Sequence, residues 1–383
     1  MTMFEKLCGI ATYLPALILV LTTIVFVHEM GHFLVARANG VKVRTFSIGF
    51  GPELFGWTDK KGTRWRLSWL PFGGYVMMLG DDDATSVKAN LKGLNEKEKS
   101  QTLTSKTPFQ RMLVSFGGPL FNFLFTLLIF AGMGLIKGIP DMVPRVGAVS
   151  EGSLAAQAGL KKGDIIRSLN GEFLATVSEM RAALEKHAGQ DVILSFERDG
   201  DLQEVLLPLY RVDDSGQKRP VTQLGVALRG AFLFQKATLG QSFLYGANYC
   251  WMSVKGLTNA LTGIFSRQKD GAKLGSIFTI GKEAKQTLDQ GWWSFMSFAA
   301  MLSLSLGFFN LLPIPTLDGG SIFLNASEIV LRRPLSEAFI TWAYRIGMTC
   351  VGILMAWALL NDFDNVPFVK HLKDTLTSWK KFF

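Results

Sequence analysis

The chain has 383 residues, a formal net charge of +9 and a mean hydropathy of +0.25, and its apolar residues are gathered into long uncharged runs. This blocked pattern is not that of an ordinary soluble domain and predicts a membrane protein. The basic residues are spread between the runs without the interleaved aromatic residues of a nucleic-acid-binding patch, so no nucleic-acid partner is predicted. The three cysteines, Cys8, Cys250 and Cys350, are too far apart to predict a disulfide framework or a CxxC zinc site.

The first uncharged run begins at Leu7 and ends in the motif His28-Glu29-Met30-Gly31-His32. Residues four apart share one face of a helix, so His28 and His32 can reach one zinc ion, with Glu29 beside it as general base toward water. We expect this run to be retained rather than removed as a signal peptide, because it carries the metal motif. The motif predicts zinc-dependent hydrolysis inside or at the edge of a membrane.

Residues 38–108 are predicted to form a cytosolic loop that contains a β-hairpin. Between Arg37 and Arg111, basic residues outnumber acidic ones by 13 to 7, which favours the cytosolic side. Residues 43–75 carry aromatic residues in partial alternation on both sides of the charged turn Asp59–Gly62, a pattern that predicts a hairpin. An edge strand of this hairpin could pair with an extended substrate. The alternative is an ordinary cytosolic hairpin that rests on the membrane surface through its tryptophans.

Three more runs are long enough to cross the hydrocarbon core, which takes roughly 20 residues of helix. Residues 112–136 and 291–317 contain no charge, and residues 339–360 contain only Arg345, near the start of the run, where its long side chain can reach the interface. The sequence thus predicts four transmembrane helices, over residues 1–37, 109–137, 291–322 and 339–361. It also predicts a cytosolic loop over 323–338 and a C-terminal tail over 362–383, with both termini opposite the cytosol.

A catalytic zinc needs a third protein ligand. The two remaining histidines, His187 and His371, lie in charged segments outside the apolar runs, whereas Asp318 directly follows the third run. An ionisable side chain at membrane depth is costly unless it is paired or binds a cation, which favours Asp318 as the ligand. Pro313 and Pro315 remove backbone donors, so we expect the helix to open just before Asp318.

The segment between the second and third runs contains a soluble insert. Residues 145–149 and 153–171, followed by the alternating stretch 191–198, resemble a bacterial PDZ domain, which we expect over residues 144–209. PDZ folds add a bound strand to a sheet edge, so the domain would bind a substrate tail or exclude bulky substrates, and both roles stay open. In residues 210–290, the aromatic stretch Phe243–Met252 predicts an amphipathic helix at the membrane interface.

Four segments carry a family resemblance, and they are His28–His32, Phe72–Asp81, Gly118–Asn122 and Asn310–Gly319. In these motifs and their order, the chain resembles the site-2 protease family of intramembrane zinc metalloproteases, and within it the bacterial regulator-of-sigma-E protease branch. The resemblance implies a polytopic α-helical membrane protein with about four transmembrane helices, a membrane-associated, re-entrant β-hairpin and an inserted PDZ domain of the α+β class. It also implies a location in the bacterial inner membrane, with the PDZ domain on the periplasmic side.

The resemblance further implies roles for single residues. His28, His32 and Asp318 would hold Zn²⁺, and Glu29 would activate water. Substrate contacts are implied for Asn310, Pro313, Pro315, Asn122, Gly73 and Gly74. An Asn in a membrane helix also serves to join helices, so this second role stays open for Asn122.

The implied substrates are the transmembrane segments of single-pass proteins, such as an anti-sigma factor already shortened by another protease, and remnant signal peptides. The lipid bilayer and a peptide or protein tail at the PDZ domain are the further partners. A catalytically idle scaffold and a metal transporter are the alternatives from other functional classes, and neither needs Glu29 as a base.

Overall fold

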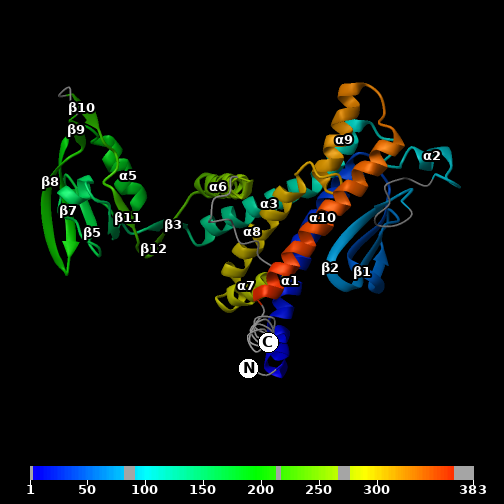
Figure 1. The fold of residues 1–383 in the computed structure, drawn as a ribbon, viewed down its shortest axis with the longest axis horizontal. Helices are drawn as coiled ribbons and strands as arrows, with labels where there is room; N and C mark the ends of the chain where they lie inside the picture. Colours follow the sequence, from blue (N-terminus) through cyan, green and yellow to red (C-terminus); the bar gives the residue numbers. More distant parts are fainter. Residues whose placement is uncertain (1–2, 82–90, 213–216, 266–276, 366–383) are drawn as a thin grey trace, which may run out of the picture. The chain divides into compact units, whose positions relative to one another are not determined.

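The computed structural model describes residues 3–81, 91–212, 217–265 and 277–365 of the chain. The chain divides into two compact units, Met1–Ala131 with Gly246–Phe383, and Gly132–Tyr245. The first unit is mainly helical and also contains a β-hairpin, whereas the second consists of short strands and two short helices (Figure 1). His371 and most of the predicted C-terminal tail lie outside the described residues.

Long helices dominate the first unit. The helices that lie in it, wholly or in part, are α1 (Met3–Ala38), α2 (Glu96–Lys99), α3 (Pro108–Ile136), α6 (Leu239–Phe265), α7 (Ile277–Asp289), α8 (Trp292–Asn310), α9 (Asp318–Leu331) and α10 (Glu337–Asn365). Among the described residues, three helical stretches are long and apolar enough to cross a membrane, namely Thr12–Ala38, Pro108–Ile136 and Trp292–Asn310. The apolar stretch of α10 that is described, Ala338–Ile353, is shorter. The chain is therefore helical with three or four candidate membrane spans.

The predicted opening before Asp318 is confirmed. Helix α8 ends at Asn310, a loop over 311–317 contains both prolines, and α9 begins at Asp318. The predicted loop over 323–338 needs a correction, because α9 continues to Leu331. No proline interrupts the chain between Pro315 and Pro334, and after Gly320 the interval includes the good helix formers Leu324, Ala326 and Glu328, so the helix restarts after the break.

Helix α6 is also longer than the sequence indicates. The helix predicted around Phe243–Met252 continues through Lys255 to Phe265. Lys255 is exposed, so its charge does not interrupt a helix that keeps one polar face.

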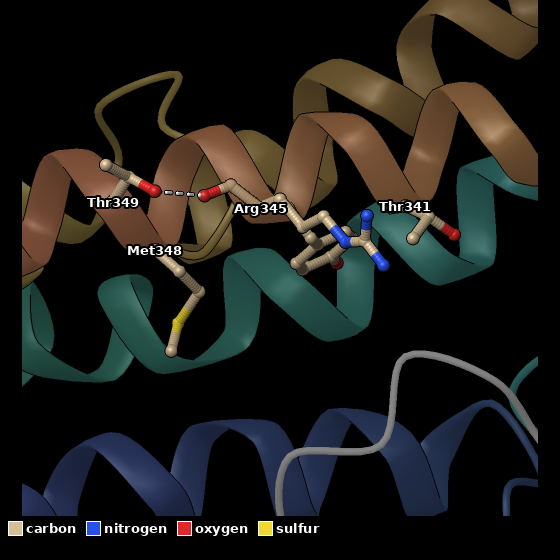
Figure 2. A pocket seen from close by; sticks show the side chains of 5 residues that line it. Thr341, Arg345, Met348 and Thr349 are labelled. Carbon is tan, nitrogen blue, oxygen red and sulfur yellow. Dashed lines mark hydrogen bonds between the residues drawn. The ribbon is translucent and has the colours of Figure 1, made fainter.

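Helix α10 packs against the loop that precedes Asp318. A Cβ on Gly347 would lie 3.0 Å from the backbone nitrogen of Thr316, and the hydroxyls of Tyr344 and Ser321 are 3.2 Å apart. Arg345 lines a hollow beside α10 together with Thr341, Tyr344, Met348 and Thr349 (Figure 2). Its guanidinium lies 5.5 Å from the ring centre of Trp342, on the side of the helix start.

Glycines let α1 and α3 cross with their backbones in contact. A Cβ built on Gly31 would lie 2.1 Å from the carbonyl oxygen of Gly117, and a Cβ on Gly117 would lie 2.7 Å from that of Gly31. Helix α8 approaches α3 in the same way, because a Cβ on Gly307 would lie 3.2 Å from the carbonyl oxygen of Pro119. The apolar core beside these crossings joins α1, α7 and α8 through Ala16, Val20, Ala284, Phe295, Phe298 and Ala299.

The predicted hairpin is confirmed, but its two strands are strongly bent. Strands β1 (Val43–Thr58) and β2 (Arg64–Met78) are antiparallel. Residues 43–48 pair with 74–78, residues 45–50 pair with 64–70, and residues 53–58 pair with 64–68. The bends fall at Gly49 and Gly51 in β1 and at Gly73 in β2, which all have positive φ. The hairpin is thus a small curled sheet whose outer segments are 53–58 and 74–78.

The turn of the hairpin is tied to the end of α1. The guanidinium of Arg37 donates to the Asp59 carboxylate at 2.5 Å and to the Thr63 hydroxyl at 2.9 Å. Asp59 also accepts from the backbone N–H groups of Lys61 and Thr63 and from the indole of Trp65. Despite partial burial, these donors hold the pKa of the Asp59 carboxyl well below its usual range.

Among the described residues, the second unit contains six antiparallel strand pairings in four small sheets. Its strands are β3 (Ile139–Met142), β4 (Val146–Val149), β5 (Ile165–Leu169), β6 (Glu172–Phe173), β7 (Asp191–Arg198), β8 (Asp201–Pro208), β9 (Tyr210–Val212), β10 (Lys218–Pro220), β11 (Val226–Leu228) and β12 (Phe232–Gln235). The largest sheet has the order β6-β5-β7-β8, and the two helices are α4 (Leu154–Gln157) and α5 (Val177–Lys186). Its core extends past Leu209, because Leu224 is buried in it and β11 pairs with β4.

We predict that Gly31→Ala destabilises the protein by about 1–3 kcal/mol, because the new methyl group forces α1 and α3 apart. Thermal unfolding of the full chain in detergent measures this as a lower midpoint. Gly132→Ala in α3 is the control, since a Cβ there meets no atom within 4 Å. Equal midpoints for the two variants would contradict the close crossing.

Candidate metal centre

Two histidines and one aspartate from distant parts of the chain converge in the first unit. The Nε2 atoms of His28 and His32 are 3.2 Å apart. The Asp318 carboxylate lies 3.2 Å from His28 Nε2 through one oxygen and 3.4 Å from His32 Nε2 through the other. This is the group of three that the sequence predicts, and it is the group among the described residues whose geometry suits a metal ion.

Local structure brings each ligand to the cluster. His28 and His32 lie one turn apart on α1, and Asp318 opens α9. Gly319 and Gly320 are buried against the loop before them, where a Cβ would lie 2.3 Å from the carbonyl oxygen of Leu311 or 2.1 Å from that of Ile314. Only glycine permits this contact, so the Asp-Gly-Gly sequence presses the first turn of α9 onto the loop.

An ion pair anchors the rest of α9 to α3. Arg111 donates to the nearly buried Glu328 carboxylate at 2.5 Å, and the second oxygen of Glu328 accepts from the backbone N–H of Leu335. Breaking a buried pair of this kind leaves an uncompensated charge, so the contact resists separation. The position of Asp318 is therefore set from both ends of its helix.

The donor set fits zinc. Ligand atoms around a four-coordinate zinc with bonds of about 2.0–2.2 Å lie about 3.3 Å from one another, close to the spacing of the three atoms here. The Nδ1–H of His32 donates to the carbonyl oxygen of Val114 at 2.9 Å, which leaves the Nε2 lone pair of this imidazole for the metal. Two imidazoles and one carboxylate also leave the fourth position open, as catalytic zinc requires.

The backbone of α3 forms one wall of the cluster at Gly118. A Cβ on Gly118 would lie 2.4 Å from His32 Nε2 and 2.8 Å from His28 Nε2. Any larger residue would occupy space next to the Nε2 atoms of both histidines. The sequence indicates Gly118 only as part of a family motif, and this steric role depends on the crossing of α1 and α3.

Glu29 and Asn310 lie beside the ligands. The Glu29 side chain faces β2, where a Cβ on Gly74 would lie 3.3 Å from its Cγ atom. Asn310 is the last residue of α8, and its Nδ2 atom lies 3.2 Å from His28 Nε2. The structure thus brings the predicted general base and one predicted substrate contact to the same place as the metal ligands.

The other predicted substrate contacts differ in accessibility. Gly73 and Gly74 lie in β2, and Pro313 and Pro315 lie in the partly exposed loop before Asp318. Asn122 is fully buried, and its amide contacts His28 and Ser303 instead of an open surface. For Asn122 this geometry departs from the predicted substrate contact and agrees with the alternative role of joining helices.

We predict that Gly118→Ala removes most of the bound zinc, because the added methyl group displaces His32 Nε2. Metal content of the purified protein by mass spectrometry measures the loss. Gly132→Ala, on the same helix but with no atom within 4 Å of the new Cβ, should keep the full zinc content. Full zinc content in Gly118→Ala would show that α3 does not lie against the ligands.

Comparison with known proteins agrees with this site. The sequence profile of peptidase family M50 matches residues 16–354. A Rhizobium meliloti protein whose name describes it as a putative zinc metalloprotease is 35% identical over 359 residues, which cover 92% of this chain and 96% of the relative. The Caulobacter vibrioides protein named Metalloprotease MmpA is 30% identical over 391 residues, which cover 94% of this chain and 98% of the relative. The resemblance to the site-2 protease family is confirmed, and its metal is Zn²⁺. The chain belongs to peptidase family M50 and is a zinc metalloprotease with several membrane-spanning helices.

Proposed function

We propose that this protease cleaves peptide bonds within the transmembrane segments of single-pass proteins in the bacterial inner membrane. This proposal is supported above all by the position of the proposed metal ligands along an apolar helix. His28 lies ten residues before the end of α1 at Ala38, or roughly 15 Å at the rise of an α-helix. Anti-sigma-factor-like proteins already shortened by another protease, and remnant signal peptides, are the proposed substrates.

The proposed chemistry assigns His28, His32 and Asp318 to the metal and Glu29 to proton transfer. When bound, Zn²⁺ supplies Lewis acidity that polarises the scissile carbonyl and promotes ionisation of water. The Glu29 carboxylate takes the proton of the attacking water. It then delivers this proton to the amine nitrogen as the peptide bond breaks.

Asn310 and the loop after it are the proposed contacts of the unwound substrate. The amide of Asn310, 3.2 Å from His28 Nε2, can donate to the carbonyl oxygen under attack and stabilise its developing charge. Pro313 and Pro315 keep the loop over 311–317 out of a helix, so an extended substrate chain could lie against this loop.

The hairpin is proposed to be a re-entrant element that receives the substrate as an added strand. It runs along α1 from Arg37 back to Glu29, eight residues or roughly 12 Å of helix. The outer segment 74–78, next to Gly73 and Gly74, is the edge that would pair with the substrate. Lipid contact would explain the exposed apolar side chains of Phe50, Leu54, Phe55, Trp57, Trp69 and Leu70.

The second unit is proposed to be a PDZ domain on the periplasmic side. Supporting features are the antiparallel sheet β6-β5-β7-β8 and the amphipathic helix α5, whose Met180, Ala183 and Leu184 are buried. A sheet edge of this domain would bind a peptide or protein tail or exclude bulky substrates.

We further propose that α10 is a fourth span and that α6 lies at the membrane interface. Four spans would keep both termini and the PDZ domain opposite the cytosol. Interfacial placement of α6 would explain its exposed Leu239, Phe243, Leu244, Trp251 and Met252. Membership of a peptidase family favours this function over the scaffold and the metal transporter.

We predict that Glu29→Gln keeps its zinc but cleaves a model transmembrane substrate in detergent at least about 100-fold more slowly, the effect of losing a general base. Chelation should abolish cleavage by the unmodified protein, and added Zn²⁺ should restore it. His32→Ala should lose zinc, whereas His187→Ala, at the C-terminal end of α5, should keep it. Normal cleavage by Glu29→Gln would refute the proposed base.

A separate prediction concerns the tie between Arg37 and Asp59. Asp59→Asn should lower kcat/KM for the transmembrane substrate without changing zinc content, because it loosens the hairpin and leaves the ligands in place. Glu172→Gln, which breaks an exposed pair with Lys186 in the second unit, is the matched control.

The pH dependence of this tie follows from the lowered pKa of Asp59. A depressed folded pKa means that the carboxylate stabilises the hairpin fully above its ordinary value of about 4, and that this stabilisation is lost as the pH falls toward the lowered value. Asp59→Asn should therefore lose stability at neutral pH and differ little from the unmodified protein in strong acid. An equal stability difference at both pH values would contradict the assignment.

A further inference from the structure

The Nδ1 atom of His28 does not face solvent or a backbone carbonyl. It lies 3.0 Å from the amide Nδ2 of Asn122 on α3, whose Oδ1 faces Ser303, and Asn122 is fully buried. The Nδ1–H group of His32, by contrast, donates to the carbonyl oxygen of Val114. The two imidazoles are thus oriented by different kinds of partner, one by backbone and one by a side chain.

The tautomer of His28 determines whether Asn122 must donate a hydrogen bond to it or accept one from it. If Nε2 of His28 binds the metal, Nδ1 carries the proton and needs an acceptor. Only the amide oxygen of Asn122 can accept it, which requires the amide to present its oxygen to His28 and its NH2 group to Ser303. A half-turn of the planar amide exchanges these two groups with little movement of the heavy atoms.

The far end of the amide is also held in place. Ser303 of α8 is fully buried, and its hydroxyl lies 3.1 Å from Asn122 Oδ1, the position that the NH2 group takes when the amide is turned. A hydroxyl can accept from the NH2 group, so Ser303 is a suitable partner in the orientation that His28 requires. The chain of contacts therefore runs from α8 through α3 to a metal ligand on α1.

We propose that Asn122 is a positioning residue that accepts the Nδ1 proton of His28 and thereby aims Nε2 at the metal, while Ser303 fixes the amide. This inference rests on the proposed role of His28 as a zinc ligand, and it involves no substrate. The contact would then do more than join two helices, because His28 would be the donor and its Nε2 atom would be held toward the metal.

The structure offers a matched control one turn further along α3. Thr126 is fully buried like Asn122, and its hydroxyl contacts the carbonyl oxygens of Ala300 on α8 and of Asn122. Thr126→Val removes a buried polar contact between the same two helices without touching a metal ligand. A purely structural role for Asn122 would make its variants behave like Thr126→Val.

Zinc affinity of the full chain in detergent, measured by competition with a chelator of known affinity, tests the proposal without any substrate. Asn122→Leu, which has similar volume but no acceptor, should bind zinc about 10–100-fold more weakly, as expected when the outer partner of a ligating His is lost. Asn122→Asp keeps an acceptor toward His28 Nδ1 and should stay near the unmodified protein. Thr126→Val should keep its zinc affinity even where its thermal midpoint falls.

Cobalt substitution supplies a second readout. The visible absorption of Co²⁺ in the site should change in Asn122→Leu and stay unchanged in Thr126→Val. The proposal is overturned if Asn122→Leu binds zinc normally, if Asn122→Asp is as weak as Asn122→Leu, or if Thr126→Val weakens zinc equally. His32→Ala separates this failure from that of the metal site itself, because normal zinc binding by His32→Ala would refute the ligand set.

Discussion

Two imidazoles and a carboxylate in apolar surroundings are costly unless a shared cation compensates them, and the helices around them are arranged so that the three groups meet. An isolated Asp318 in this position would lack the solvation that a carboxylate needs. A metal held by His28, His32 and Asp318 satisfies all three groups at once. The open backbone between α8 and α9 is subject to the same limit, because unpaired peptide groups at membrane depth persist only inside the protein or beside a wet cavity. The three polar groups and the break between α8 and α9 are therefore both expected inside the protein, at the same place.

Close backbone contacts at glycines make this arrangement of helices possible. Gly31 and Gly117 let two helices touch, Gly118 leaves room for the ring nitrogens, and Gly319 and Gly320 seat the first turn of α9 on its loop. Each approach removes space that water or lipid would otherwise fill. Close packing of backbone against backbone then positions the ligands more rigidly than long side chains would. The curled hairpin also lies along α1, so the 74–78 segment of β2 and Glu29 are neighbours.

The sequence predicts well which residues meet at the candidate metal centre, because their signals are local. A four-residue spacing on a helix identifies His28 and His32, and a proline-rich break followed by an acid identifies Asp318. The hairpin was also predictable from its turn and aromatic strands. The bends at Gly49 and Gly73, the continuation of α9 to Leu331 and the burial of Asn122 were not, because each depends on contacts between elements far apart in the chain. Asn122 shows this most clearly, since a polar residue in an apolar helix has the same local pattern whether it meets substrate, another helix or a metal ligand.

X-ray absorption at the zinc edge, on purified protein in detergent, reports which atoms hold the metal. We expect one zinc per chain with two imidazole nitrogens and carboxylate or water oxygens at about 2.0–2.2 Å, and no sulfur in the coordination shell. Removal of Asp318 should leave the imidazole scattering of any remaining zinc intact and change only the oxygen shell. A sulfur shell near 2.3 Å, or a spectrum that is unchanged when His28 is replaced, would contradict the proposed centre.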